Sequence, residues 1–384
     1  MAKDLIVFGE DWGGLPSSTQ HLIRQLLIHS DRKVIWINSI GLRKPHWSRK
    51  DMTRLWRKAT AKKVAGKYVQ SDELNVVDGQ QFQVINPKTI PVPDGCIQRQ
   101  IAAWLLAWQI KPMMRKMGIE QPILWVSLPT AVDMVGHFGE SAVVYYCGDD
   151  FSALAGVSHQ LVCQRETQLL TRAALILAAS PALYQKFPSD KTQLLSHGVD
   201  YTLFATPCHR ATDLPHDGKP IAGYYGSISD WLDLTLLERV IQSLPDWHFV
   251  FIGRQDIDCS VLMQYPNVYF LGPRAHHQLP SYVQHWTASL LPFVNNAQIR
   301  GCNPLKLREY LAAGQPIVST CFPAVGEYHD VIYQVTTPQQ MVAVLSHVKS
   351  ASIQASTPIK SRAAVVKESW QSRAVQLANY LEAL

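Results

Sequence analysis

Short continuous runs of apolar residues alternate with amphipathic segments along most of this chain. In a parallel sheet covered on both faces, each strand reads as such a run, while a helix against it keeps one apolar face. The first half therefore predicts an α/β domain with a parallel sheet. Its predicted strands are 5–8, 34–38, 76–85, 123–127, 142–147 and 175–180, and its predicted helices are 21–28, 97–117, 157–173 and 181–187.

The same alternation restarts after residues 206–219, which are rich in Pro, Asp and His and have no apolar periodicity. That segment is predicted to be a linker. The second set of strands is 221–225, 248–252, 268–271, 288–291 and 317–320, and the helices include 232–244, 279–286, 341–348 and 362–384. We therefore expect two Rossmann-like domains, 1–205 and 220–365, followed by a terminal helix over 366–384.

Composition places the chain among globular proteins, since 47% of the residues are hydrophobic and 17% are charged. The seven cysteines are scattered and show no CxxC spacing. We therefore expect neither a disulfide framework nor a metal site, and a reducing cytoplasm is the simplest location. Residues 1–4 lead straight into the first strand, so no signal peptide is predicted, and no apolar run reaches the ~18 residues of a membrane span.

The basic charge of the chain is concentrated in residues 43–67, where ten Lys/Arg and one Asp give +9 against a total of +6. The other residues thus carry −3, and a general nucleic-acid-binding surface is not indicated. Trp47, Met52, Leu55 and Trp56 lie among these cations. A basic amphipathic helix with tryptophan suits an anionic membrane surface. The alternative is a solvated loop with a helix docked on the domain.

One stretch, Asn303–Thr320, reads as a short helix followed by a buried strand. Asn303 is a suitable N-cap and Pro304 a suitable first helical residue, while Gly314 fits the left-handed position past the last turn. Lys306 then lies near the positive end of the helix dipole, where a cation costs about 0.3–1 kcal/mol. A bound phosphate would reverse that cost, since the free N–H groups and the lysine would both attract it.

Glu309 lies one turn after Lys306 on the same helix face and could accept hydrogen bonds from a sugar diol such as ribose. The alternative is a surface ion pair between the two side chains, worth about 0.2–0.5 kcal/mol.

This stretch resembles the donor-binding motif of GT-B glycosyltransferases of the family 4-like group, in which Pro-Leu-Lys-x-x-Glu-Tyr-Leu-Ala-Ala-Gly holds a nucleotide-sugar. The resemblance implies that Asn303, Pro304 and Leu305 begin the site, that Lys306 meets the diphosphate and that Glu309 meets the ribose. It also implies two domains facing a central cleft, a last helix that crosses back to the first domain, and no metal cofactor. Many members carry another Glu eight positions before the one that matches Glu309, and this chain has Gly301 there. The contacts to the donor sugar and the stereochemical course therefore stay open.

Other candidates follow predicted strands, where ligands of α/β sheets bind. Asp149 or Asp150 is a candidate base for the acceptor hydroxyl; alternatively the pair begins a helix. Gly226 and Ser227 are candidates for phosphate contacts; alternatively Ser229 or Asp230 caps the next helix. The resemblance adds Arg254 and Arg274, whose guanidinium groups would suit a diphosphate.

The loop after the first strand, Gly9–Pro16, lacks the G-x-G-x-x-G fingerprint of a dinucleotide site. By resemblance, Trp12, Gly13 and Gly14 could contact the acceptor or the reacting sugar; alternatively the glycines form a tight turn. His197, His276 and His277 are expected to serve the structure.

Together these observations predict a cytoplasmic, membrane-peripheral glycosyltransferase. It would move a sugar from a nucleoside-diphosphate donor, most simply UDP-linked, to a glycan or lipid-linked acceptor of cell-surface polysaccharide. Two alternatives remain: a nucleotide-sugar epimerase of the same fold, and a non-catalytic subunit of a glycan-assembly complex.

Overall fold

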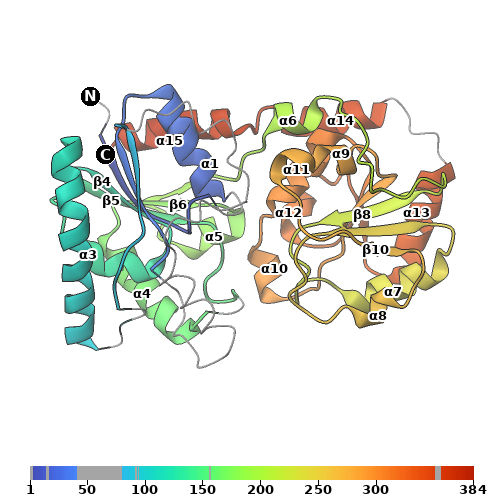
Figure 1. Ribbon diagram of the computed structural model, residues 1–384, viewed down its shortest axis with the longest axis horizontal. Coiled ribbons are helices and arrows are strands. Elements are labelled where there is room, and N and C mark those ends of the chain that lie inside the picture. Colours follow the sequence, from blue (N-terminus) through green and yellow to red (C-terminus); the bar gives the residue numbers. More distant parts are fainter. Residues whose placement is uncertain are drawn as a thin grey trace. The chain divides into compact units, whose positions relative to one another are not determined.

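The computed structural model describes residues 3–13, 17–40, 80–90, 93, 95–154, 157–350 and 356–384, which divide into two compact units (Figure 1). The first unit consists of Met1–Ser196 with Ala374–Leu384, and the second of His197–Arg373. Each unit has its own parallel sheet and its own hydrophobic core. The prediction of an α/β chain with two parallel sheets is confirmed.

The first unit is built on a seven-stranded parallel sheet in the order β3-β2-β1-β4-β5-β6-β7. Its central strands are fully buried because helices cover both faces: α1 lies on one side in Figure 1, and α3 and α4 lie on the other. Its elements are β1 (Leu5–Phe8), α1 (Ser18–His29), β2 (Val34–Ile37), β3 (Phe82–Ile85), α3 (Cys96–Met117), β4 (Ile123–Val126), the 3₁₀ helix η2 (Pro129–Met134), β5 (Ala142–Cys147), α4 (His159–Arg172), β6 (Leu175–Ala178), α5 (Pro181–Lys186) and β7 (Thr192–Leu194).

The second unit repeats this plan on a six-stranded parallel sheet in the order β10-β9-β8-β11-β12-β13. Its elements are α6 (Tyr201–Ala205), β8 (Ile221–Tyr225), α7 (Leu234–Ser243), β9 (His248–Ile252), α8 (Ser260–Met263), β10 (Val268–Phe270), η3 (His276–Gln278), α9 (Pro280–Val283), β11 (Ala288–Leu291), α10 (Ala297–Gly301), α11 (Leu305–Ala313), β12 (Ile317–Thr320), α12 (Pro323–Gly326), β13 (Tyr333–Val335), α13 (Pro338–Ser350), α14 (Ser356–Val365) and α15 (Trp370–Glu382), whose last residues belong to the first unit.

Each sheet has one point at which the strand order reverses. In the first unit β1 lies between β2 and β4, and in the second β8 lies between β9 and β11. The loops that leave neighbouring strands on either side of this point diverge, which opens a crevice beyond the carboxyl ends of the strands. The loops after β1 and β4, and after β8 and β11, are therefore where each unit can hold a ligand.

Two predicted boundaries differ from the structure. Residues 197–205 group with the second unit, because the buried Phe204 packs against Tyr225 and His276, with ring centroids 6.5 and 5.4 Å apart. The predicted terminal helix 362–384 is two helices, α14 and α15, because Ser369 forms a β-bridge with Val199 between them.

Two predictions concern residues outside the described ranges. The basic segment 43–67 and Gly14 both lie there. Among the described residues, no helix combines the length and the apolar character that crossing a membrane requires.

Candidate functional site

The ammonium group of Lys306 lies at the reversal point of the second sheet. Lys306 is in the first turn of α11, and its half-buried side chain turns toward the ends of β8 and β11. Its Nζ donates to the Tyr224 hydroxyl at 3.2 Å and lies 4.9 Å from the Tyr224 ring and 5.6 Å from the Phe293 ring. Cation–π attraction of about 0.5–1 kcal/mol per ring at partly exposed sites favours this position over bulk water.

Gly226 gives this ammonium group its space. A Cβ atom on Gly226 would lie 2.6 Å from the Nζ of Lys306, and its φ of +131° is one that other residues rarely adopt. Gly253, which follows the adjacent β9, has a φ of +147°, and a Cβ there would lie 1.9 Å from the Gly226 carbonyl oxygen. Two strand ends thus approach as bare backbone directly below the cation. Ser227 follows, and its carbonyl accepts a hydrogen bond from Tyr224 at 3.1 Å.

The start of α11 differs from the prediction in one respect. Pro304 occupies the N-cap position, and the helix begins at Leu305 without a side-chain cap and without an acidic residue in its first turn. The amide oxygen of Asn303 instead accepts from the guanidinium of Arg308 at 2.6 Å. Arg308 is buried, so its donors need partners inside the protein, and Asn303 is one of them. The predicted Asn303 cap is therefore wrong, and the helix dipole at Leu305 and Lys306 is not offset by a capping side chain.

Glu309 is buried one turn further on and is held by two side chains. One carboxylate oxygen accepts from Nε2 of His276 at 2.7 Å, and the other accepts from the Tyr225 hydroxyl. Burial, and then the Glu309 carboxylate, raise the pKa of Tyr225 well above its usual value, so the phenol keeps its proton and donates. The alternative of a surface pair between Lys306 and Glu309 does not describe this geometry, since Lys306 donates to Tyr224 and Glu309 accepts from two other groups.

Both candidate arginines are engaged in ion pairs. Arg254 donates to Asp256 at 2.6 and 3.0 Å on an exposed loop. Arg274 donates to Asp213 at 2.6 Å and to the Tyr282 hydroxyl at 2.9 Å, and the hydrogen bond from Arg274 lowers the pKa of Asp213 despite the opposing effect of burial. The structure therefore brings Lys306, Gly226 and Ser227 together, while each guanidinium has an acidic partner. Asp233, rather than the alternative candidates Ser229 or Asp230, caps α7 by accepting from Leu236 at 2.9 Å.

In the first unit, the two candidate aspartates have different environments. Asp150 accepts from Lys186 at 2.6 Å and from the Ser152 amide at 3.0 Å; burial opposes these bonds, but they prevail and lower the pKa of Asp150. The protein around Asp149 removes water from its carboxyl, and this effect, followed by the charge of Asp150, raises the pKa of Asp149. Asp149 as a whole residue is nevertheless exposed, so water weakens the effect that raises its pKa.

Sequence reasoning missed Glu10, which follows β1 at the reversal point of the first sheet. Burial raises the pKa of Glu10 against a hydrogen bond from Gln20, and the Asp11 and Asp149 carboxylates raise it further. The Glu10 and Asp149 carboxylates follow β1 and β5, at the carboxyl ends of these strands. The signal was present in the sequence, because Glu10 directly follows the glycine that ends the first strand.

Residues 220–348, which include this Lys306 site, match the family model described as "Glycosyl transferases group 1". All of the matched residues lie in the second unit. TuaH of Bacillus subtilis (strain 168), named as a teichuronic acid biosynthesis glycosyltransferase, is 25% identical over 228 residues. That alignment spans 54% of this chain and 57% of TuaH, little more than half of each.

Solved structures agree with a GT-B fold over the whole chain. HepE of Anabaena, solved with UDP and glucose, has a TM-score of 0.71 at 14% identity and covers 100% of both chains. Sucrose-phosphate synthase of Thermosynechococcus elongatus has a TM-score of 0.69 at 14% identity and covers 99% of this chain and 98% of its own. At this level of identity the likeness concerns the fold.

Outside the matched residues, the first unit holds the loop predicted to face the acceptor. The Trp12 ring packs against Trp36 and Phe82, with centroids 4.7 and 4.6 Å away, and its amide donates to Asn38 at 2.8 Å. These contacts favour a structural role for Trp12. Gly13 is exposed with a φ of +81°, as expected for a tight turn.

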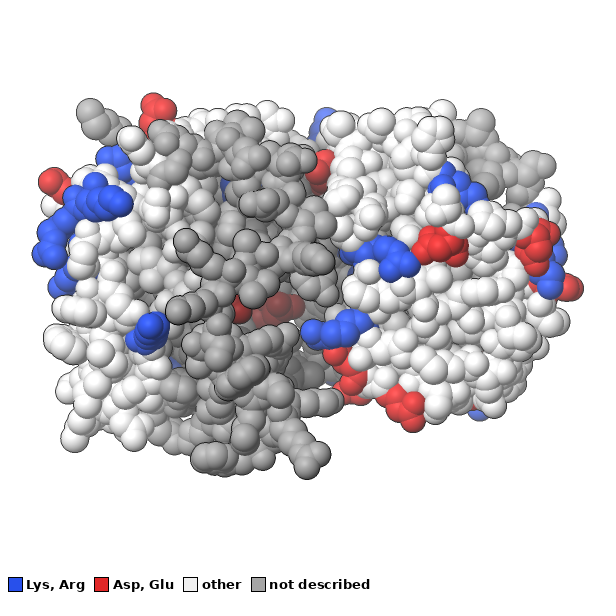
Figure 2. Space-filling model, in the orientation of Figure 1, with Lys and Arg blue, Asp and Glu red and all other residues white. Residues whose placement is uncertain are grey.

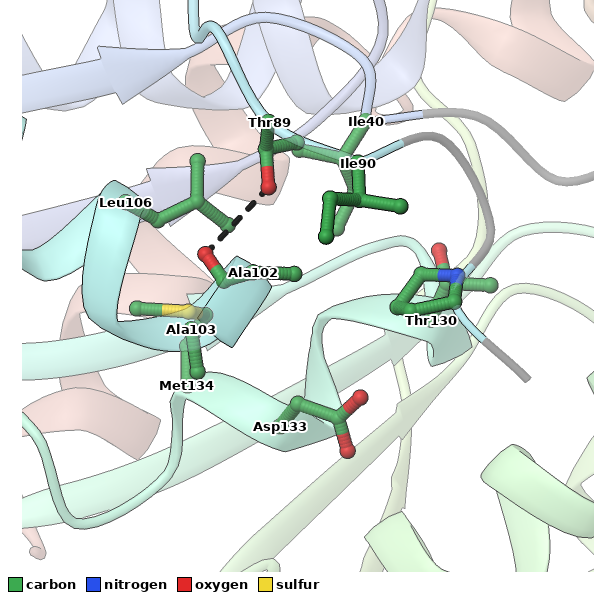
Figure 3. A pocket seen from close by; sticks show the side chains of 10 residues that line it. Ile40, Thr89, Ile90, Ala102, Ala103, Leu106, Thr130, Asp133 and Met134 are labelled. Carbon is green, nitrogen blue, oxygen red and sulfur yellow. Dashed lines mark hydrogen bonds between the residues drawn. The ribbon is translucent and has the colours of Figure 1, made fainter. Parts of the chain in front are cut away.

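Figure 3 shows a small apolar recess in the same unit, at the carboxyl ends of β2, β3 and β4. The side chains of Ile40, Ile90 and Leu106 line it, and Asp133 contributes a carboxylate. None of the predicted site residues belongs to this recess.

His276 was expected to serve the structure, and its hydrogen bond to Glu309 at 2.7 Å is a contact of that kind. In the sequence, His276 follows the Gly272-Pro273-Arg274 loop, near the end of a strand. Its contact with Glu309 joins η3 to α11, which are far apart in the sequence, so residue spacing could not predict it.

Proposed function

We propose that this protein is a glycosyltransferase that moves a hexosyl or glycuronosyl group from a UDP-linked donor to a glycan or lipid-linked acceptor in cell-surface polysaccharide synthesis. The observation that carries the proposal is the position of the Lys306 ammonium, directly above Gly226 at the uncapped start of α11. A cation next to the positive end of a helix dipole is a feature of a phosphate site.

Catalysis on this proposal is mainly electrostatic. Negative charge develops on the leaving diphosphate as the glycosidic bond breaks, and Lys306 with the start of α11 stabilises it, while Gly226 and Ser227 let the phosphate approach the backbone. No metal ion is assigned to this task. The structure pairs Arg254 and Arg274 with acids, so the proposal gives them no share of the diphosphate charge.

Glu309 would accept hydrogen bonds from the ribose hydroxyls. Each carboxylate oxygen has more than one acceptor direction, so an oxygen that already accepts from His276 or Tyr225 can accept again. These two side chains also fix the carboxylate in place, which lowers the entropy lost when a nucleotide binds.

If the reaction inverts the anomeric configuration, a base must take the proton of the acceptor hydroxyl. Asp149 fits this role better than Asp150, because the pKa of Asp149 is raised and the carboxylate of Asp150 is occupied by Lys186 and Ser152. Glu10, whose pKa is raised chiefly by burial, is the second candidate.

The UDP preference rests on relatives of the same fold, since HepE was solved with UDP and with UDP-glucose. The choice of acceptor rests on the similarity to TuaH. We also propose that the protein works in the cytoplasm at an anionic membrane surface, to which the basic segment 43–67 contributes.

Titration calorimetry of the full chain with UDP, GDP, ADP and their sugars tests the donor, followed by transfer of labelled sugar to lipid-linked acceptors. We expect UDP and one UDP-sugar to bind most tightly. Isomerisation of the sugar without any acceptor would instead identify an epimerase. Failure of every nucleotide to bind would identify a non-catalytic subunit and contradict the proposal.

A further inference from the structure

Helix α3 (Cys96–Met117) is apolar on two opposite faces. Its inner face packs Ala103, Leu106 and Ile110 into the core of the first unit. A helix on the surface of a globular protein normally turns a polar face outward. The outward face of α3 instead exposes large apolar side chains to water, which is unfavourable.

The exposed apolar residues of α3 form one stripe. Ile97 is 73% exposed, Ile101 46%, Trp104 62% and Trp108 67%. Their spacings of four, three and four residues place them in a row on one side of the helix, roughly 16 Å long at 1.5 Å per residue. Lys111 and Arg115 continue the same row by three and four residues, and both are exposed.

The charge of α3 has one sign. The helix contains Arg99, Lys111, Arg115 and Lys116 and no Asp or Glu. Arg99 is paired with Asp133, which leaves three exposed cations in the last two turns, next to the two tryptophans. Figure 2 shows Lys and Arg side chains gathered at the edge of the first unit where Figure 1 places α3.

We infer that the outer face of α3, defined by Ile97, Ile101, Trp104, Trp108 and the cations Lys111, Arg115 and Lys116, docks on an anionic lipid surface. Tryptophan favours the boundary between lipid headgroups and acyl chains, where its apolar ring is buried and its N–H stays hydrated. Adjacent cations then meet the anionic headgroups, each contributing about 1 kcal/mol.

A second copy of the chain fits this face less well. Helix–helix seams use Leu, Ile and Val with acid–base pairs along their flanks. The outer face of α3 has two tryptophans, and the helix has no acidic residue to pair with the cations of a neighbouring copy.

This inference gives the membrane contact of the proposed function a described surface, but it requires neither nucleotide binding nor sugar transfer. The two can therefore fail separately: vesicle binding tests α3, and UDP titration tests the Lys306 site.

The test is co-sedimentation of the full chain with vesicles of phosphatidylcholine alone and with vesicles that also contain phosphatidylglycerol. We expect binding only to the second kind, and binding that weakens as salt is added. Lys111→Gln/Arg115→Gln/Lys116→Gln should lower the partition coefficient on the order of 100-fold. Trp104→Gln/Trp108→Gln should lower it by a similar factor, because two large apolar side chains no longer enter the interface.

The matched control is Ile359→Gln on α14, since Ile359 is 68% exposed in the second unit and should not affect vesicle binding. Circular dichroism melting of each variant confirms folding. A measurement that does not need a polar substitution is quenching of tryptophan fluorescence by brominated phosphatidylglycerol, which should fall in Trp104→Phe/Trp108→Phe while binding persists.

Four results would overturn the inference. Two concern binding: equal binding of the wild type to both kinds of vesicle, and unchanged binding in the Lys/Arg→Gln or Trp→Gln variants. The others are unchanged quenching in Trp104→Phe/Trp108→Phe, and a wild-type dimer that Trp104→Gln/Trp108→Gln converts to monomer.

Discussion

Gly226 is the residue on which the position of the Lys306 ammonium depends most directly. At the residue scale, the site consists of one cation, two rings that hold it, and a strand end without a side chain below it. Each contact stabilises the Lys306 ammonium by about 1 kcal/mol or less, so its position depends on all of the contacts together.

Gly226→Ala should weaken UDP binding roughly tenfold or more, because its Cβ would lie 2.6 Å from Nζ and displace the cation from the phosphate. The left-handed backbone should also cost about 1–3 kcal/mol of stability. Gly13→Ala is the control: its φ of +81° brings similar strain, but nothing lies within 4 Å of the added carbon. Calorimetry with UDP should show a loss in the first variant alone, and equal affinities would contradict the assignment.

Asp150→Asn should move the acidic limb of the pH–rate profile to lower pH. If Asp149 is the base, as proposed, the rate requires it to be deprotonated, and its raised pKa sets that limb at a higher pH than for a free carboxyl. Removing the Asp150 charge lowers the pKa of Asp149, because that charge is one of the two causes that raise it. The measurement is kcat/KM against pH for both proteins. A limb that stays in place, or moves to higher pH, would exclude Asp149 as the base.

Residue roles could be predicted from sequence where local rules decide them. Lys306 in the first turn of a helix conflicts with the dipole whatever surrounds it, and Gly314 has the left-handed φ of +89° that its position implied. Asn303 could not be predicted, because its partner is the buried Arg308, and burial of a guanidinium depends on tertiary packing.

At the scale of elements, α11 is anchored by a charged network at its buried side. Arg308 is 1% exposed and donates to Glu368 at 2.5 Å, and Glu368 also accepts from the Tyr328 hydroxyl at 3.0 Å. Glu368 lies between α14 and α15, so the segment that precedes the last helix fixes the helix that carries Lys306.

Glu368→Gln should lower the free energy of unfolding by about 3 kcal/mol, since it leaves a buried guanidinium without its countercharge. Glu238→Gln is a suitable control, because Glu238 accepts from a single neutral group, the Tyr265 hydroxyl, and its loss should cost under about 1 kcal/mol. Denaturant unfolding followed by circular dichroism gives both values. Equal costs in the two variants would show that the network does not anchor α11.

Most strands and long helices could be predicted, because their apolar patterns are long enough to identify the type of element, as for β8 and α3. Short elements such as β13 and α10 were missed, since three to five residues carry little periodicity. The break between α14 and α15 was missed because a long-range β-bridge, between Ser369 and Val199, causes it.

At the scale of the whole molecule, two sheets of related topology each place chemistry beyond the carboxyl ends of their strands. The second unit offers a cation at the point between β8 and β11, and the first offers the carboxylates Glu10 and Asp149 after β1 and β5. The sequence predicted the two-sheet architecture, because the strand–helix alternation occurs twice. It did not predict that Glu10 would belong to the site at this end of the first sheet, because that depends on strand order, and strand order is not local.

The central claim is that Lys306 and the start of α11 bind the β-phosphate of the donor. The most direct measurement is the ratio of the affinities for UDP and UMP, by calorimetry, in the wild type and in Lys306→Met, which keeps the length of the side chain and removes its charge. We predict that the wild type binds UDP more tightly than UMP. In the variant this affinity ratio should fall roughly 10- to 100-fold, which corresponds to the loss of one hydrogen bond to a charged group. An unchanged UDP-to-UMP ratio in Lys306→Met would contradict the account.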